Sequence, residues 1–301
     1  MKRKADDVDD VEARRQALLA DGYVQDTRVL SQKNAHTRDP LIFFRASDHV
    51  YVYVAPGEAN RTFVSASTFA KVFFEEFDTD VAIGKVFGSN AWKNGTHKLQ
   101  GMTSDEIKAK WNSGRDLGTI MHDDIERYLN DEQLTPEEMG TPEFQQFLDF
   151  EATWLAHARV KVYRTEWRLY DEESGYCGTL DWICAYTKQD DPDVLQMMLL
   201  DHKRCEKIKL QEKRYFGKGC CADLNDNNYV KYGLAMNLYK YMLEKNYKNV
   251  VFEGVTYKSV KVVDMWLNVM HPLHDGFQVF HVPDRGAKLV EMFAERNAAK
   301  K

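Results

Sequence analysis

The feature that most constrains the fold of this chain is an apolar run, residues 194–200 (VLQMMLL), which leads directly into Asp201-His202-Lys203. A short and nearly continuous apolar run is typical of a β-strand that is buried on both faces. Side chains two residues apart on a strand point to the same face, so we expect Asp201 and Lys203 to project together, opposite His202. An aspartate at the end of a buried strand is costly unless a charged group meets it. The run therefore predicts a central sheet with a charged site at one strand end.

A second carboxylate, Asp181, precedes this run in the sequence. Residues 160–170 and 177–186 have the pattern of strands, and residues 171–176 (DEESGY) have turn chemistry, which predicts a hairpin. If the second strand also pairs with the apolar run, Asp181 lies beside Asp201. Two neighbouring carboxylates repel each other unless a cation lies between them, and their oxygens suit Mg²⁺ or Mn²⁺.

Lys203 completes a pattern that suits phosphodiester hydrolysis. A lysine beside a bound metal can position the attacking water and stabilise the charge that develops on the phosphate oxygens. The alternative is that Asp201 and Lys203 form only a strand-end ion pair and that Asp181 is a turn residue. The order of hairpin, aspartate, loop, apolar strand and Asp-x-Lys is far more restrictive than the tripeptide alone.

Two upstream residues are further candidates for the same site. His122 and Glu126 are four residues apart and share one face of a predicted helix. An imidazole ligand favours Mn²⁺ or another transition metal over Mg²⁺. Glu166, in the strand before the hairpin, is a candidate contact to a metal or a water. The alternatives are a half-buried histidine of the core and a solvent-facing glutamate.

The segment that follows Lys203 is strongly basic. Residues 203–218 contain two acidic and seven basic residues, a net charge of +5: Lys203, Arg204, Lys207, Lys209, Lys213, Arg214 and Lys218. Tyr215 and Phe216 interrupt the basic residues. Because the whole chain has a formal charge of −6, only a local patch such as this one can attract nucleic acid. The segment could hold a phosphate backbone, or it could be a solvated loop.

The remaining pattern predicts an α/β fold with helices covering a sheet. Helices are expected from Ser65 or Ser67 through Phe77, over 103–130 with a bend or break near Gly114 and Gly118, and over 141–157, 228–247 and 289–296. Further strands are expected over 49–54, 250–255 and 260–269. No repeat or linker divides the chain, so we expect an N-terminal extension over residues 1–60 and one domain over residues 61–301.

The composition limits the class of protein. The 301 residues contain no apolar run near the ~18 residues that a membrane span needs, and the charged N-terminus does not resemble a secretory signal. The absence of such a run also predicts no membrane partner. Five cysteines fit no iron–sulfur or zinc spacing, so we expect reduced thiols and no iron–sulfur cluster. We expect an intracellular protein of the cytoplasm or nucleus of a host cell. Lys2-Arg3-Lys4 could belong to a nuclear address or to a solvated tail.

Taken together, these residues resemble the PD-(D/E)XK nuclease superfamily. The resemblance is to its RecB-like and lambda-exonuclease-like branch, nearest to members found in large DNA viruses, and it covers roughly residues 60–295. The matching pieces are Ser65 to Phe69 with Phe77-Asp78, Gly118 to His122 with Ile125-Glu126, Glu166, Gly178 to Asp181, Leu200 to Arg204, Asn228-Tyr229 with Tyr232, Asn237 to Tyr239 with Leu243-Glu244, and Val269 to Pro272.

The resemblance implies a restriction-endonuclease-like core, a central mixed sheet flanked by helices, with N-terminal helical and β additions. It also implies roles for individual residues. The metal would be bound by His122, Asp181, Asp201 and the carbonyl of His202, and Lys203 would be catalytic. Glu166 would support the metal site, and Tyr239 would contact it from a late helix. That helix motif usually has glutamine four residues before the tyrosine, where this chain has Ala235.

The activity implied is Mg²⁺- or Mn²⁺-dependent hydrolysis of DNA, by an exonuclease or end-processing enzyme of replication, recombination or repair. Two alternatives stay open. One is a weak or inactive nucleic-acid-binding protein on a nuclease fold, which Ala235 and the acidic net charge would suit. The other is an enzyme that acts on RNA. Cleavage polarity, strand preference and oligomeric state do not follow from the sequence.

Overall fold

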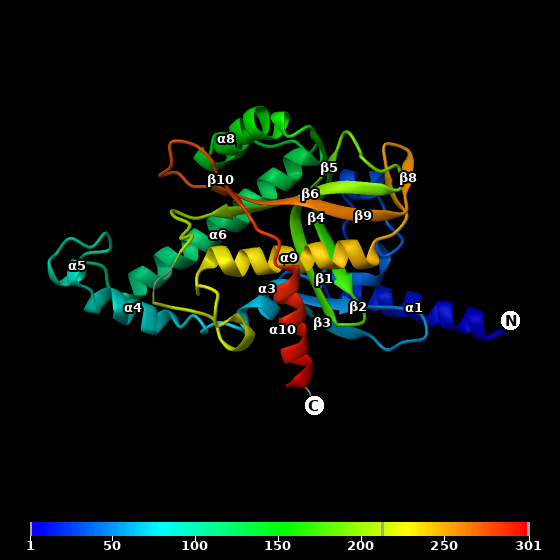
Figure 1. The fold of residues 1–301 in the computed structure, drawn as a ribbon, viewed down its shortest axis with the longest axis horizontal. Helices are drawn as coiled ribbons and strands as arrows, with labels where there is room; N and C mark the ends of the chain where they lie inside the picture. The colour runs from blue at the N-terminus through cyan, green and yellow to red at the C-terminus, as the bar shows by residue number, and fades with distance from the viewer. Residues whose placement is uncertain (1, 212–213, 300–301) are drawn as a thin grey trace.

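A mixed eight-stranded β-sheet forms the centre of the fold in the computed structural model, which describes residues 2–211 and 214–299 (Figure 1). Seven strands follow the order β1-β2-β3-β5-β6-β9-β10, and β4 pairs with β5. A separate two-stranded ribbon is made of β7 and β8. The strands are β1 (Ile42–Arg45), β2 (Val50–Tyr53), β3 (Arg61–Ser65), β4 (Val160–Asp171), β5 (Tyr176–Tyr186), β6 (Val194–Arg204), β7 (Val250–Phe252), β8 (Val255–Tyr257), β9 (Ser259–Met270) and β10 (Gln278–His281).

Helices surround the sheet, so the predicted α/β class, with N-terminal helical and β additions, is confirmed. The helices are α1 (Lys2–Ala20), α2 (Val29–Lys33), α3 (Ala66–Lys71), α4 (Thr79–Gly88), α5 (Asn90–Lys93), α6 (Ser104–Leu129), α7 (Pro136–Met139), α8 (Pro142–Asp149), α9 (Asn228–Asn246) and α10 (Gly286–Ala298), with the short turns η1 (Asp39–Leu41), η2 (a π-helix, Phe150–Leu155) and η3 (Gly219–Cys221). Within the described residues, no helix has the length and apolar character needed to cross a membrane.

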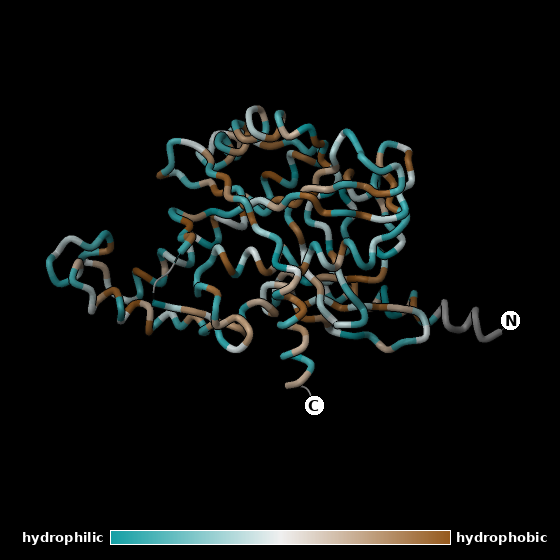
Figure 2. Tube along the Cα trace, in the orientation of Figure 1, coloured by the Kyte–Doolittle hydropathy of each residue, from teal (hydrophilic) through white to brown (hydrophobic). Residues whose placement is uncertain are grey.

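The predicted three-strand meander forms the middle of the sheet. Strands β4 and β5 are an antiparallel hairpin, β5 pairs antiparallel with β6, and β6 pairs parallel with β9. The apolar run of β6 is buried from Leu195 to Leu200, apart from the half-buried Gln196. Hydrophobic stretches follow the central strands and their covering helices, while the connecting loops are mostly hydrophilic (Figure 2).

Strand β5 has a gap in its pairing on one edge. Its partner β4 accompanies it along one edge from Tyr176 to Tyr186. The other edge pairs first with β3, at Tyr176 and Cys177, and then with β6, from Trp182 onward. Residues 178–181 lie between these two partners and have none on that edge. The sheet therefore splits at the segment that ends in Asp181.

Two hydrophobic layers cover opposite faces of the sheet. Helices α3, α9 and α10 pack on the face that carries Ile183 and Leu199. Helices α6 and α8 pack on the face that carries Trp182 and Leu200. Because alternate residues of a strand face opposite ways, Asp181, Asp201 and Lys203 belong to the face covered by α9. The charged site thus lies where the sheet splits and between the two layers.

The first 60 residues are packed on the rest of the chain. The predicted boundary after residue 60 falls between β2 and β3, which pair with each other in the main sheet. Arg164 of β4 is almost fully buried and pairs with Asp26 at 3.0 Å and Asp39 at 2.7 Å. The Asn34 amide donates to the Tyr163 carbonyl at 2.6 Å. These contacts join residues 1–60 to the main sheet, and the boundary after residue 60 stays a prediction.

Two helix predictions also need correction. The helix after Ser65 is shorter than expected, since α3 ends at Lys71 and Phe77 lies beyond it, exposed. Helix α6 is continuous from Ser104 to Leu129, with no break at Gly114 or Gly118. The helix begins at the predicted place, and a capping box between Thr103 and Glu106 satisfies its first turn. A glycine inside a helix lowers its stability by about 1 kcal/mol, which is too little to break a packed helix.

Candidate metal centre and active site

Asp181, Asp201 and Lys203 lie together, in the geometry expected from the sequence. The Nζ atom of Lys203 is 2.7 Å from Oδ2 of Asp201 and 3.8 Å from Oδ2 of Asp181. Strand β6 brings Asp201 and Lys203 to one face because they are two residues apart. Asp181 is opposite Asp201 because the pairing of β5 and β6 runs up to Trp182 and Leu200. One ammonium group thus lies within ion-pair distance of two carboxyl groups.

The carboxylate of Asp181 replaces the missing strand pairing. The backbone N–H of His202 donates to Oδ2 of Asp181 at 2.8 Å, just beyond the last paired residues of β5 and β6. The ring of His202 points to the other face and contacts Trp182, Phe147 and Phe150. Burial there lowers the pKa of His202 well below its usual value. The ring of His202 is therefore held in the apolar layer, with an edge contact to His122, and a metal contact through the His202 carbonyl stays a prediction.

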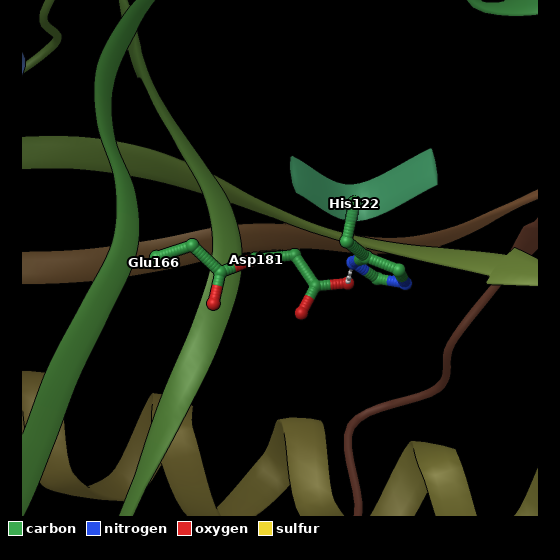
Figure 3. A group of neighbouring side chains, drawn as sticks. All are labelled: His122, Glu166 and Asp181. Atoms are coloured by element: carbon green, nitrogen blue, oxygen red, sulfur yellow. Dashed lines mark ion pairs between the residues drawn. The ribbon is translucent and has the colours of Figure 1, made fainter. Parts of the chain in front are cut away.

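A possible metal-binding group forms around Asp181. His122 from α6, Glu166 from β4 and Asp181 from β5 each offer a ligand atom, and these atoms lie within 4.8 Å of one another. Figure 3 shows the three side chains converging, with His122 approaching from α6 toward the two strands. Nδ1 of His122 is 3.3 Å from Oδ2 of Asp181, and the ring also bonds the backbone of His202.

This group differs from the expected set of metal ligands at one position. His122 and Asp181 are in it, but Asp201 is not, and Glu166 stands in its place. Asp201 instead has its carboxyl group against the ammonium of Lys203. Glu126, one turn after His122, is also outside the group because it pairs with Arg28 at 3.3 Å. Burial raises the pKa of Glu126 to about 7, although Arg28 opposes the shift.

The backbone of Glu166 is in an unusual conformation. The flanking pairs Thr165–Trp182 and Trp167–Leu180 place Glu166 opposite Asp181, but its own pair is missing from the ladder. Its φ is 43°, in the left-handed region, which costs a residue with a Cβ about 1–2 kcal/mol. Such strain persists only when the surroundings enforce it, and it gathers at functional sites. Here it coincides with a glutamate aimed at a buried aspartate.

The three carboxyl groups hold protons more tightly than usual. Burial, and then the charge of Asp181, raise the pKa of Glu166 well above its usual value and that of Asp201 to about 6. Burial also raises the pKa of Asp181, against the lowering effect of Lys203. One ammonium does not balance three carboxylates that are buried or half-buried. A divalent cation would supply the missing positive charge.

Of the two basic side chains of the site, one is neutral and the other is positively charged at neutral pH. Burial and the nearby Lys203 lower the pKa of His122 to about 4, so its imidazole is neutral and has a lone pair for a metal. Burial opposes the charge on Lys203, but Asp201 and Asp181 outweigh it and raise the lysine pKa. Lys203 is therefore an ammonium group, which suits it to stabilise negative charge and excludes it as a base.

The metal-free chain should lose stability as the pH rises. Asp201 has a pKa of about 6 in the fold against an ordinary 3.8, so its stabilising contribution is complete below 3.8 and is lost as the pH rises through about 6. In EDTA, the unfolding free energy of the wild type relative to Asp201→Asn should fall by roughly 2–3 kcal/mol from about pH 4 to about pH 7. Urea unfolding at the two pH values measures this difference, and a relative stability that rises with pH would contradict it.

Tyr239 reaches the site from α9 because the facing strand residue is a glycine. A Cβ on Gly178 would lie 2.8 Å from Cε1 and 2.9 Å from the hydroxyl oxygen of Tyr239. The tyrosine is buried, and burial raises its pKa well above the usual value, with smaller contributions from Asp201 and Asp181. Its hydroxyl is therefore neutral and can only donate or accept a hydrogen bond. Ala235, one turn earlier, is also buried and offers no polar group.

Gly178→Ala should displace Tyr239, since both partners are buried and the contact is far inside van der Waals distance. We expect the unfolding free energy to fall by about 1–3 kcal/mol, the usual effect of overpacking. Gly114→Ala is the matched control, because nothing lies within 4 Å of its added Cβ and the position is helical. Urea unfolding should show that variant to be as stable as the wild type or more so. Equal stability of both variants would remove the packing role of Gly178.

The basic segment places its predicted nucleic-acid contacts unequally. Lys207, Lys209, Arg214 and Lys218 are exposed, whereas Lys213 lies outside the described residues. Arg204 is mostly buried, and its Nε is 2.5 Å from Oε1 of Glu143, so this side chain joins β6 to α8 instead of reaching solvent. A contact from Arg204 to nucleic acid would require breaking that pair.

One neighbour of Lys203 had no role assigned from the sequence. The ring of Tyr232 lies 5.1 Å from Nζ of Lys203, a cation–π contact. Tyr232 and Tyr239 are seven residues apart on α9, which puts them on the same helix face. The resemblance had included Tyr232 in a matching piece, and this spacing places it on the face of Tyr239, but neither signal gave it a role.

The site as a whole brings an imidazole and two carboxylates to one point, with a third carboxylate and an ammonium beside them. This donor set fits a hard or borderline divalent cation such as Mg²⁺ or Mn²⁺. No protein-family model matches the chain, and no curated protein is significantly similar to it.

Proposed function

We propose that this chain is a metal-dependent nuclease of the PD-(D/E)XK type that hydrolyses phosphodiester bonds of DNA. The observation that carries the proposal is the group of His122, Glu166 and Asp181, whose ligand atoms lie within 4.8 Å, next to the ammonium of Lys203. Three neighbouring carboxyl groups of raised pKa beside a neutral histidine are the kind of perturbed cluster that gathers at functional sites. The resemblance of the motifs around these residues gives independent support.

A divalent cation bound by His122, Glu166 and Asp181 would supply a Lewis acid and lower the pKa of a bound water. The residues of the chain do the rest. Lys203 stabilises the negative charge that develops on the phosphate oxygens, and Asp201 holds the lysine in place through their 2.7 Å contact. The neutral hydroxyl of Tyr239 orients the substrate or a bound water by hydrogen bonding from the α9 side. The exposed basic residues after β6 hold the phosphate backbone.

The test is cleavage of end-labelled DNA and RNA by the purified full chain, with Mg²⁺, with Mn²⁺ and with EDTA. We expect cleavage of DNA that requires the metal and is lost in Asp181→Asn and Lys203→Ala. Asp193→Asn and Lys258→Ala are matched controls, since these two residues pair with each other at 2.7 Å on the surface. Unchanged cleavage in both site variants would reject the assignment, and cleavage confined to RNA would change the substrate.

A second candidate is a nucleic-acid-binding protein that has lost cleavage. The observation that favours it is Ala235, which places a methyl group where the resembled motif has an amide on the face of Tyr239. That loss removes a hydrogen-bonding group without touching the metal ligands. Binding of DNA without cleavage in either metal, and recovery of cleavage in Ala235→Gln, would favour this candidate.

A further inference from the structure

A helical arm extends from the body of the fold. Helices α4 and α5 pack against the first half of α6 and project to one side (Figure 1). Their small core is built on Ile83, Leu99 and Ile107 and is distinct from the two cores of the sheet. Helix α6 continues without a break from this arm to His122. The arm is therefore rigidly connected to the candidate active site.

Exposed aromatic side chains gather at the base of this arm. Among the described residues, three large aromatic side chains are exposed: Phe77 at 70%, Tyr215 at 50% and Phe216 at 46%. Exposed aromatics are normally scattered singly over a protein surface. Here all three belong to two short segments, one leading into α4 and the other in the basic segment after β6.

These two segments lie side by side. The backbone N–H of Lys218 donates to the Phe73 carbonyl at 2.7 Å, and its Nζ is 2.8 Å from Oε1 of Glu75. Lys85 of α4 lies over the ring of Tyr215, with Nζ 5.2 Å from the ring centre. Tyr215 and the ammonium of Lys85 therefore lie together, and Phe77 and Phe216 belong to the same two neighbouring segments. We call Phe77, Lys85, Tyr215 and Phe216 the aromatic platform.

The segment that carries Tyr215 is linked to α9, which borders the candidate active site. The Tyr215 carbonyl accepts from the Asp226 N–H at 2.9 Å, and Asp226 pairs with Lys231 at 2.6 Å. The next residue, Tyr232, contacts Lys203. Helix α6 exposes Leu117 and Ile120 immediately before His122. A strand held on the platform would therefore lie beside the two helices, α6 and α9, that contribute His122 and Tyr232 to the site.

We propose that the aromatic platform binds single-stranded DNA and delivers it to the site, an inference that rests on the proposed nuclease function. Bases of a single strand can stack on exposed aromatic rings, whereas the faces of paired bases are hidden within a duplex. The exposed Lys207, Lys209 and Arg214 lie in the same segment as Tyr215 and carry positive charge that attracts an anionic strand. The substrate is therefore a single-stranded end or overhang.

Binding is measured first, in EDTA, by fluorescence anisotropy with labelled oligothymidylate, its duplex with oligoadenylate, and oligouridylate. Each of Phe77→Ala and Tyr215→Ala should weaken binding of the single strand by about tenfold, the usual loss of one stacked base. Tyr215→Phe should retain binding because it retains the ring. Leu273→Ala, at an exposed apolar residue that is not part of the platform, should have no effect.

Hydrolysis is measured separately with bis(4-nitrophenyl) phosphate and Mn²⁺. This small diester has no chain of nucleotides that could bind the platform while its phosphate is in the active site. The platform variants should hydrolyse it like the wild type, whereas Lys203→Met should not. Hydrolysis by Lys203→Met at the wild-type rate would reject the nuclease function. The anisotropy measurements would still test the platform, because they do not depend on hydrolysis. Single-strand binding that is unaffected by the aromatic variants, or no tighter than duplex binding, would overturn the platform.

Two other results would also overturn the proposal. Equally tight binding of oligouridylate would show that the platform does not select DNA. A wild-type dimer that becomes monomeric in Phe77→Ala, with DNA binding unchanged, would show that a second copy of the chain covers the platform. Sedimentation velocity of the full-length wild type and of Phe77→Ala measures whether such a dimer forms.

Discussion

Replacing Lys203 by methionine should abolish most DNA cleavage and also destabilise the metal-free chain. The ammonium lies 2.7 Å from the carboxyl group of Asp201 and 3.8 Å from that of Asp181, and its loss leaves both without this cation. Removing one donor that stabilises developing charge typically lowers kcat by about 10²–10³. Breaking a buried ion pair by removing one partner costs about 3–5 kcal/mol. Single-turnover cleavage and urea unfolding in EDTA measure the two effects.

The stability loss in Lys203→Met should depend on pH. Near pH 8 Asp201 is above its pKa of about 6 and its charge repels the neighbouring Asp181, whereas near pH 5 Asp201 takes up a proton even beside the lysine. The variant should therefore recover much of its stability at the lower pH. Lys258→Met, at an exposed surface pair, is the control and should show neither effect. A loss of stability that is the same at both pH values would contradict the charge-based explanation.

Asp181→Asn should remove the stabilisation of the chain by Mn²⁺ without destabilising the metal-free fold. A metal at one hundred times its Kd stabilises the wild type by about 2.7 kcal/mol, a Tm increase of roughly 5–10 °C for a chain of this size. The asparagine keeps an oxygen to accept from the His202 N–H and removes a buried charge that raises the pKa of Glu166. In EDTA the variant should thus be at least as stable as the wild type.

Differential scanning calorimetry with and without Mn²⁺ tests this prediction. Glu166→Gln should behave in the same way, because Glu166 belongs to the same group of ligand atoms. Asp193→Asn, on the surface, should keep the full response to the metal. If Mn²⁺ stabilised Asp181→Asn as much as the wild type, the metal would have to bind elsewhere in the chain.

The sequence predicted the parts of the site that depend on strand periodicity. The pairing of Asp201 with Lys203 follows from their spacing of two on a buried strand, and the hairpin turn placed Asp181 on the neighbouring strand. These are local properties, because alternation along a strand decides which side chains share a face.

The parts that the sequence did not predict depend on contacts between distant segments. The split in the sheet at residues 178–181 arises because β3 and β6 pair with different ends of β5. The left-handed backbone of Glu166 follows from no local propensity, since glutamate disfavours that region. The burial of Arg164 against Asp26 and Asp39 joins residues more than a hundred positions apart. Periodicity in one strand contains no information about such contacts.

The central claim is that His122, Glu166 and Asp181 bind one divalent cation beside Lys203. Anomalous diffraction from crystals of the full chain soaked in Mn²⁺ tests it most directly. We predict one strong peak bounded by these three side chains, which is absent from crystals of Asp181→Asn. A peak only at another acidic cluster, or none within ligand distance of Asp181, would contradict the claim.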